Sequence, residues 1–235
     1  MSQSDSSNRT SSVPQIENRV AAAYSKFEEN LRNKVQALEC DWGAEVTIVV
    51  YKHEKRMEIF LQQRSGKFCL FDTIDICAAS GSPGRKIRQG DKQVPEGFYH
   101  VGVLNPKSTY HLSLGLNFPN NADQVIVDPH EPGGEIYIHG GCTSSGCCAI
   151  TDEAIEWLYV LCDAAKKASK PPANVMILPC RFGETTLSWQ DMEFENWSTF
   201  WAGIQEGWLW FMNQKTWPKM EVDSKGNYLL ISEVN

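Results

Sequence analysis

One short segment of the chain concentrates residues whose types and spacing suit covalent chemistry. It reads IYIHGGCTSSGCCAIT over positions 136–151 and holds one histidine and three cysteines. Cys147 follows Gly146, which has no side chain, so a substrate or the backbone can approach the thiol closely. Cys147 also precedes Thr151, a good helix N-cap, and the positive end of a helix dipole is expected to lower the pKa of the thiol. His139 ends an apolar run, and the loop that follows is long enough to double back on it.

A thiol beside an imidazole base is the minimum apparatus for acyl transfer through a thioester. In this interpretation Cys147 attacks a carbonyl carbon, His139 takes the thiol proton, and backbone N–H groups around Gly146–Cys148 form the oxyanion hole. The residues leave open two alternatives, a zinc site and a disulfide between Cys142 and Cys147. The zinc site would take four ligands from one short loop, at a spacing that fits no familiar C-x2-C pair: His139, Cys142, Cys147 and Cys148.

Hydrophobic periodicity indicates the elements that must position this segment. An amphipathic helix is predicted over 17–38, and a second helix is predicted to begin after Thr151 and to end before Pro171. Runs of β-forming residues bounded by turn residues predict strands at 46–52, 56–63, 71–80, 98–104, 110–118, 124–128, 135–140 and 174–182. The chain is therefore predicted to be an α+β protein. It should have a β-rich core, a helix after the cysteine segment, and flanking N- and C-terminal helices.

The region 183–235 is rich in tryptophan, which would suit the stacking of carbohydrate. Most of its aromatic residues recur at helical spacings, so a helix packed against the core explains them more simply. These helical positions are Trp197, Phe200, Trp201, Trp208 and Phe211, and the remaining tryptophans of the region are Trp189, Trp210 and Trp217. A hairpin is predicted around Ser224–Asn227.

Composition and charge bound the class of function. Lys and Arg number 22 against 29 Asp and Glu, and the formal net charge of −7 argues against a general nucleic-acid binder. No apolar run approaches the roughly 20 residues that a transmembrane helix needs. The polar start of the chain lacks the basic flank and apolar stretch of a signal peptide, which predicts either a cytosolic protein or a leader that has been removed.

The cysteine segment resembles the active-site segment of the L,D-transpeptidase (YkuD-type) catalytic family. It is most similar to the branch whose motif joins a His-Gly pair to Ser-x-Gly-Cys. Three further blocks resemble that branch, in order: ICAASGSPGRKIRQGDKQVPEGFYHV at 76–101, LNFPNNAD at 116–123 and VMILPCRF at 175–182. The resemblance implies a YkuD-like catalytic core of mixed, curved sheets. The expected division is a disordered tail (1–15), an N-terminal helix packed on the core (16–40), the catalytic domain (41–182) and a Trp-rich extension (183–235).

The resemblance also implies roles for particular residues. Cys147 is expected to be the nucleophile and His139 the base. The other matched positions are Ser144, three residues before the cysteine, and the motif glycines Gly140 and Gly146. The wider family usually has a second histidine directly before Gly-Cys, where this chain has Ser145, so one oxyanion or orienting contact has to come from elsewhere.

The substrate of this family is the peptidoglycan stem peptide, whose carboxylates are expected to bind cationic side chains. Lys86, in the basic loop 84–92, matches the family block, and Arg181 at the end of a predicted strand is a second candidate. Tyr99 is expected either to form an aromatic wall of the cleft or to belong to the core. Cys148 is expected to face the core behind the nucleophile, with its backbone N–H among the oxyanion donors.

The resemblance therefore predicts an enzyme without cofactor or metal that takes an acyl group from a stem peptide and passes it to an amine. With water as the acceptor, the same site is an amidase or carboxypeptidase that removes crosslinks or a wall-attached protein. A non-catalytic wall-binding or metal-stabilised module is the alternative of another class. Peptidoglycan lies outside the cytoplasmic membrane, so the function predicts a periplasmic or cell-envelope location and a leader upstream of Met1.

Overall fold

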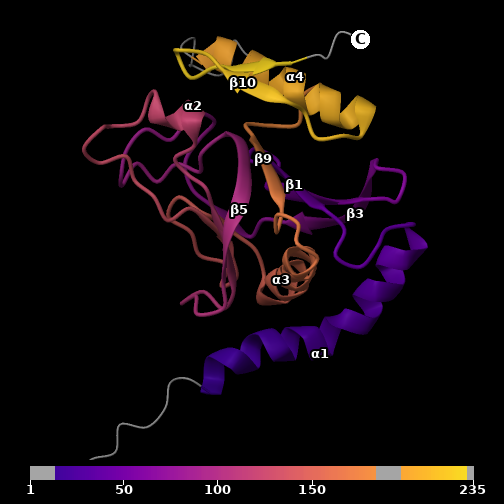
Figure 1. Ribbon diagram of the computed structural model, residues 1–235. Coiled ribbons are helices and arrows are strands. Elements are labelled where there is room, and N and C mark those ends of the chain that lie inside the picture. Colours follow the sequence, from indigo (N-terminus) through magenta and orange to yellow (C-terminus); the bar gives the residue numbers. More distant parts are fainter. Residues whose placement is uncertain (1–13, 184–196, 232–235) are drawn as a thin grey trace, which may run out of the picture.

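A nine-stranded sheet organises the computed structural model, which describes residues 14–183 and 197–231 (Figure 1). The strand order is β3-β2-β1-β9-β5-β6-β7-β8-β4, in which β1–β9 and β7–β8 are parallel pairs and the other pairs are antiparallel. The strands are β1 (Val46–Tyr51), β2 (Arg56–Gln62), β3 (Phe68–Asp75), β4 (Ala78–Ala79), β5 (Gly97–Asn105), β6 (Ser113–Leu116), β7 (Tyr137–His139), β8 (Cys148–Ala149) and β9 (Asn174–Leu178). This mixed sheet, with helices on its flanks, confirms the predicted α+β class.

Helices lie on both sides of the sheet (Figure 1). They are α1 (Pro14–Ala37), the short α2 (Asn121–Gln124), α3 (Asp152–Lys167) and α4 (Ser198–Gln214), and a hairpin of β10 (Met220–Val222) and β11 (Tyr228–Leu230) follows α4. The predicted N-terminal, central and C-terminal helices and the C-terminal hairpin are thus confirmed. The predicted tail and Trp189 fall on residues 1–13 and 184–196, outside the described residues. Within the described ranges, no helix is long and apolar enough to cross a bilayer.

The sheet separates two apolar cores, which explains why β1 is buried at every position. Ile48 and Val50 of β1 pack in the core formed with α1 and α3, whereas Val49 packs in the core formed with α4. A strand with both faces covered is expected to be apolar throughout rather than alternating. On α4, Trp201 is 1% exposed and belongs to the second core, as the helical spacing of the aromatic residues predicts.

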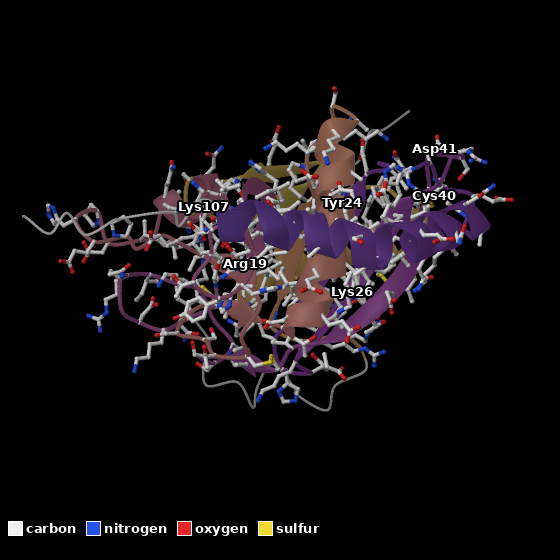
Figure 2. The ribbon with its side chains drawn as sticks, turned by 90° about the horizontal axis from the view of Figure 1, so that it is seen from below. Arg19, Tyr24, Lys26, Cys40, Asp41 and Lys107 are labelled. Atoms are coloured by element: carbon white, nitrogen blue, oxygen red, sulfur yellow. A yellow bond between two sulfur atoms is a disulfide. The ribbon has the colours of Figure 1, made fainter. Side chains whose placement is uncertain are left out.

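Helix α1 crosses α3 and reaches a loop that borders the cysteine segment, as Figure 2 shows from below. The hydroxyl of Tyr24 donates a hydrogen bond to the Asp163 carboxylate of α3 at 2.7 Å. Near the start of α1, one guanidinium nitrogen of Arg19 donates to the carbonyl oxygens of Ser108 and His111, at 3.0 and 2.8 Å. These bonds satisfy carbonyls of the loop between β5 and β6, so α1 helps to hold that loop against the sheet.

The structure corrects the prediction of a strand at 124–128. Asn120 instead caps α2: its side-chain oxygen accepts hydrogen bonds from the backbone of Ala122 and Asp123, and Asp123 accepts one from the Asn120 N–H. This capping box starts a helical turn just before the apolar residues that suggested a strand. Val125 is 46% exposed, so the alternating pattern of this run does not correspond to a buried sheet face.

The predicted strand at 71–80 is divided into two strands with different partners. β3 pairs with β2 at one edge of the sheet, whereas β4 pairs with β8 at the opposite edge. Cys77 lies between them, where the chain passes from one edge to the other. This crossing brings the residues around Cys77 and Ser80 beside the cysteine segment.

Candidate active site

The register of β7 against β8 brings His139 and Cys147 to the same face of the sheet. In this parallel pair His139 lies opposite Ala149, and Ile138 lies opposite Cys148. Side chains alternate along a strand, so Cys147, two residues before Ala149, shares the face of His139. Cys148 and Ile138 point the other way and are 2% and 0% exposed, as expected for a cysteine that faces the core.

Cys147 and His139 both line a cavity of about 310 Å³. The other wall comes from the loop before β6, including Tyr110, and from Glu135 and Tyr137 at the start of β7. The ring of Tyr110 lies against the imidazole of His139 with a centroid separation of 4.7 Å and an interplanar angle of 31°. His139 itself is 3% exposed, so this contact helps to fix the plane of a buried ring.

The hydrogen bonds of His139 define which ring nitrogen carries the proton. Its Nδ1 lies 2.6 Å from the carbonyl oxygen of Gly140, and a carbonyl oxygen only accepts hydrogen bonds. Nδ1 is therefore the protonated nitrogen of the neutral ring, by assignment from this contact. The lone pair of Nε2 is left to accept a proton, which is the state that a general base requires.

Asp152 holds the peptide group that orients His139. The carboxylate of this first residue of α3 accepts a hydrogen bond at 2.8 Å from the N–H of Gly141, which belongs to the same peptide group as the Gly140 carbonyl. A carboxylate, a peptide group and an imidazole are thus joined in series. A side chain at Gly140 would collide with the Asp152 carboxylate, which explains the glycine at this motif position.

The backbone around Cys147 is held by two serine hydroxyls. Ser144 Oγ accepts a hydrogen bond from the Cys147 N–H at 2.9 Å and donates one to the Cys147 carbonyl at 2.6 Å. Gly146 has φ +107°, a conformation that favours glycine, and its N–H donates to Ser80 Oγ at 2.6 Å. Ser80 in turn donates to the Lys92 carbonyl at 2.8 Å, so the nucleophile loop is tied to the loop after β4.

These bonds change the expectation for the oxyanion hole. The predicted donor Gly146 and its neighbour Cys147 both spend their N–H groups on serine oxygens. The backbone of Cys148 belongs to β8, which is paired on both edges. The N–H of Tyr137 instead points at Cys147 Sγ, 3.4 Å away, and is the amide that the structure places against the sulfur.

Burial is the largest influence on the Cys147 thiol, and it raises the pKa above the ordinary value of a cysteine. The Tyr137 N–H and the positive charge of Lys86 lower the pKa, and the negative charge of Glu135 raises it. The prediction that the helix N-terminus makes Cys147 a low-pKa thiol is therefore wrong, because loss of water around the sulfur outweighs the favourable charges. A thiol in this environment needs a base to become a nucleophile, and its Sγ–H faces the Glu135 carbonyl at 3.6 Å.

A disulfide joins Cys142 to Cys77, with the two Cα atoms 5.3 Å apart. The alternative of a Cys142–Cys147 disulfide is therefore wrong, and Cys147 is a free cysteine. Cys142 is also removed from the candidate zinc ligands, because a disulfide sulfur is not a thiolate. Across the described residues, no group of three or more His, Cys, Asp or Glu side chains is arranged to hold a metal ion.

The residues expected to bind substrate carboxylates lie away from the cavity wall. Lys86 is 4% exposed, and its ammonium group forms an ion pair with Asp91 at 2.6 Å. Arg181 forms an ion pair with Glu58. Both cations are thus committed to the fold, although the charge of Lys86 still acts on the Cys147 thiol.

Tyr99 is 2% exposed. Its hydroxyl lies 3.0 Å from both the Glu96 carbonyl and an Asp123 carboxylate oxygen. Of the two expectations for this residue, the buried position in the core is the one the structure supports.

Several site residues escaped the sequence interpretation. Tyr110, Tyr137 and Ser80 come from other strands and loops and reach the site only through the sheet. Asp152 was interpreted as an acidic residue in the first turn of a helix, and it also ends the family motif. That second property was the signal for a role beyond the helix.

Comparison with known proteins agrees with this geometry. The family model of the L,D-transpeptidase catalytic domain matches residues 45–177. A protein named "Putative L,D-transpeptidase YafK", from Escherichia coli, is 31% identical over 191 residues, which cover 80% of this chain and 74% of that protein. Among solved structures, the helical cell shape determining protein Pgp2 of Campylobacter jejuni aligns with 72% of the chain at 21% identity and a TM-score of 0.47.

The chain spans 57% of the Campylobacter structure. A second structure, Bd1075 of Bdellovibrio bacteriovorus, aligns with 58% of this chain and 49% of its own length, at 20% identity and a TM-score of 0.41. The family model covers more than half of the 235 residues, and the curated relative extends the match beyond it. The chain belongs to the L,D-transpeptidase catalytic-domain family.

Proposed function

We propose that this protein is a peptidoglycan-modifying cysteine acyltransferase that carries a stem-peptide acyl group on Cys147. The observation that supports this most directly is the pairing of β7 with β8, which turns Cys147 and His139 toward one cavity. The Nδ1–H of His139 is spent on the Gly140 carbonyl, so Nε2 is the nitrogen that would accept the thiol proton. A buried thiol with a raised pKa makes this base necessary.

In the first half-reaction, Sγ of Cys147 bonds to the carbonyl carbon of the diaminopimelate residue, and the thiol proton passes to Nε2 of His139. The bond from that carbon to the nitrogen of the terminal D-alanine then breaks. The departing nitrogen takes the proton from Nε2, and D-alanine leaves as an amine. In the second half-reaction an acceptor amine attacks the thioester and gives a proton to Nε2. The carbon–sulfur bond breaks, and the sulfur recovers that proton.

The proposed location is the cell envelope, where the peptidoglycan lies. The Cys77–Cys142 disulfide supports this location, because structural disulfides form and persist in oxidising compartments. The net charge and the absence of a spanning helix in the described ranges are compatible with an enzyme that works on a polymer outside the membrane.

A thioester-trapping experiment tests the function. The protein is incubated with a defined disaccharide-tetrapeptide, quenched in acid and weighed intact. Wild type is expected to gain the mass of the substrate minus D-alanine, and Cys147→Ala is expected to show no adduct. Cys69→Ser is the matched control, because Cys69 is a partly exposed free thiol away from the cavity, and it should react like wild type.

The products then separate transfer from hydrolysis. With an amine acceptor present, a crosslinked product supports the transferase. Release of the free tripeptide alone would assign the protein to the amidase or carboxypeptidase group that uses the same acyl-enzyme. Turnover by Cys147→Ala at the wild-type rate would contradict both assignments.

A further inference from the structure

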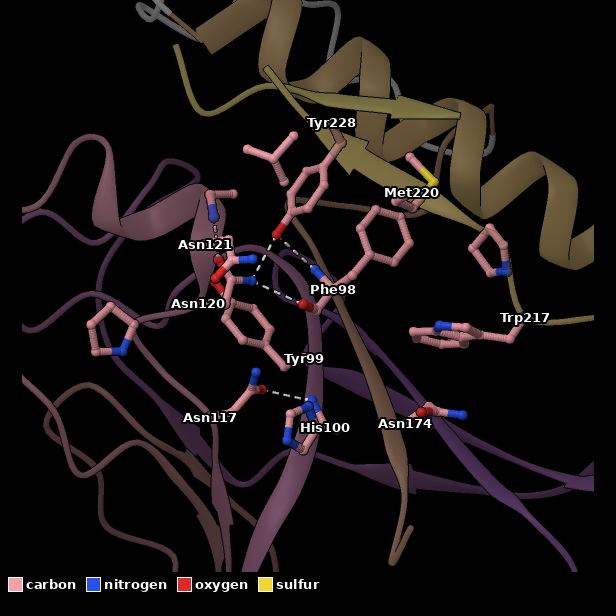
Figure 3. Close-up of a pocket in the computed structure, with 14 residues that line it drawn as sticks. Phe98, Tyr99, His100, Asn117, Asn120, Asn121, Asn174, Trp217, Met220 and Tyr228 are labelled. Carbon is pink, nitrogen blue, oxygen red and sulfur yellow. Dashed lines mark hydrogen bonds between the residues drawn. The ribbon is translucent and has the colours of Figure 1, made fainter. Parts of the chain in front are cut away.

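A second cavity, of about 540 Å³, lies where the C-terminal hairpin meets β5 (Figure 3). Its walls come from three parts of the chain: the first half of β5, the loop around α2, and the segment from Trp217 to Tyr228. Its volume falls in the range of about 300–1,000 Å³ that small-molecule sites occupy. None of the residues that line the cavity beside Cys147 lines this one.

The lining of this cavity is polar but uncharged. Among the described residues that form it there is no Asp, Glu, Lys or Arg, although 51 of the 235 residues of the chain are of these types (22 Lys and Arg, 29 Asp and Glu). The cavity beside Cys147, by contrast, includes Lys107 and Glu135. A ligand that enters the second cavity finds no ion-pair partner on its walls, so its chemistry is that of a neutral molecule.

Three asparagine side chains keep hydrogen-bonding capacity for such a ligand. Asn117 accepts a hydrogen bond from the His100 N–H at 2.8 Å, which leaves both of its amide N–H bonds without a partner in the described part of the chain. Asn121 and Asn174 have no side-chain hydrogen bond to any described residue. Each amide offers a donor and an acceptor to one ligand, which suits paired hydroxyl and acetamido groups.

Aromatic rings form the other wall, and they support one another. The ring of Phe98 packs edge-to-face with Trp217 at 5.9 Å and with Tyr228 at 4.9 Å. Asn120 donates hydrogen bonds to the Phe98 carbonyl at 2.9 Å and to the Tyr228 hydroxyl at 2.8 Å, which fixes the hairpin against β5 (Figure 3). Trp217 remains partly exposed, and its indole N–H has no acceptor among the described residues.

We propose that this cavity binds the glycan strand of peptidoglycan, through a neutral N-acetylated sugar. The aromatic wall suits the C–H face of a pyranose ring, and the three amides suit its hydroxyl and acetamido groups. A stem peptide does not fit the same lining, because its carboxylates would lie without a cation. The choice of this glycan, among neutral saccharides, rests on the function proposed above.

The two cavities lie along one strand, which gives the proposed site a role. His100 of β5 lines the saccharide cavity and Asn105, at the other end of β5, lines the cavity with Cys147. Five residues of extended strand separate these positions by about 17 Å. A glycan held at Trp217 would keep its attached stem peptides within reach of Cys147, so the site would raise the local concentration of substrate.

Binding of a sugar oligomer without stem peptides tests the site. Calorimetry with a tetramer of β-1,4-linked N-acetylglucosamine is expected to show binding to wild type, and Trp217→Ala and Asn174→Ala are each expected to weaken it by about ten-fold or more. Trp210→Ala is the matched control, because Trp210 is a partly exposed tryptophan of α4 that does not line the cavity. Asn174→Ala leaves the aromatic wall in place, so its effect does not depend on refolding of the hairpin.

The outcomes separate this proposal from the proposed function. Failure of wild type to bind the oligomer, equal binding by all four proteins, or competition by a sugar-free stem peptide would each overturn the saccharide site. If the oligomer binds as expected but Cys147 forms no thioester, the site stands and the acyltransferase does not. If both stand, Trp217→Ala should raise KM for the disaccharide-tetrapeptide and leave the reaction of the free tetrapeptide unchanged.

Discussion

Cys77 and Cys142 are joined by a disulfide that ties the segment between β3 and β4 to the loop preceding Cys147. The bond lies five residues before Cys147 in the sequence, and β4 pairs with β8 next to it. Because Cys142 also adopts a positive φ of 46°, the path of the nucleophile loop is constrained at its start as well as at Ser144 and Gly146. The disulfide is thus part of the support of the active site.

Removal of this bond is expected to destabilise the protein. The two cysteines are 65 residues apart, and loop-closure entropy for a loop of that length corresponds to about 4 kcal/mol of unfolding free energy. Cys142→Ser is expected to lose about 2–4 kcal/mol in urea unfolding under oxidising conditions, since native-state relaxation offsets part of the entropy. Cys77→Ser should match it, and the double variant should lose no more than either. Equal stability of wild type and both single variants would show that the bond does not form in solution.

The reactivity of Cys147 is expected to keep rising with pH beyond the range of an ordinary cysteine. Burial raises the pKa of its thiol, so the thiolate forms at higher pH, and alkylation by iodoacetamide should follow that titration. Lys86→Met removes a positive charge that lowers this pKa, and is therefore expected to move the alkylation profile to still higher pH. Arg88→Met, at an exposed position of the same loop, is the control and should leave the profile in place. A shift to lower pH in Lys86→Met would contradict the assigned electrostatics.

Asp152 is expected to act as a positioning residue for His139. Asp152→Ala removes the acceptor of the Gly141 N–H, so the Gly140 carbonyl that holds Nδ1 is less fixed, and kcat is expected to fall by about ten-fold with little change in KM. Asp152→Asn keeps an oxygen acceptor and should recover most of the rate. Glu153→Ala removes the neighbouring acidic residue of the same helical turn and serves as the control for the helix dipole. Equal losses in Asp152→Ala and Glu153→Ala would leave no role for the peptide contact.

Ser144→Ala tests the support of the nucleophile. The substitution breaks both hydrogen bonds between this hydroxyl and the backbone of Cys147, so acylation is expected to slow by about ten-fold or more while the fold persists. Ser145→Ala changes the adjacent, exposed serine and is expected to acylate at the wild-type rate. Stopped-flow acylation and far-UV circular dichroism measure the two properties separately. An undiminished rate in Ser144→Ala would remove this residue from the site.

The sequence alone determined the features that depend on local patterns. The N-cap at Thr151, the amphipathic helices, the hairpin of β1 and β2 and the candidate pair Cys147 and His139 are all encoded by neighbouring residues. Local propensity and periodicity act over a few residues, so they are visible without the fold. The same reasoning failed at 124–128, where capping by Asn120 starts a helical turn that a count of apolar residues does not detect.

The tertiary structure decided everything that depends on contacts between distant residues. It chose Cys77 as the partner of Cys142, gave the N–H of Gly146 to Ser80, and paired Lys86 with Asp91 instead of leaving it on the cavity wall. It also raised the pKa of Cys147 by burying the thiol. Trp217 belongs with these, because only the docking of the hairpin against β5 turned one tryptophan of an aromatic-rich tail toward a cavity. Burial and long-range pairing arise when strands far apart in the sequence join one sheet, and a linear pattern does not contain that information.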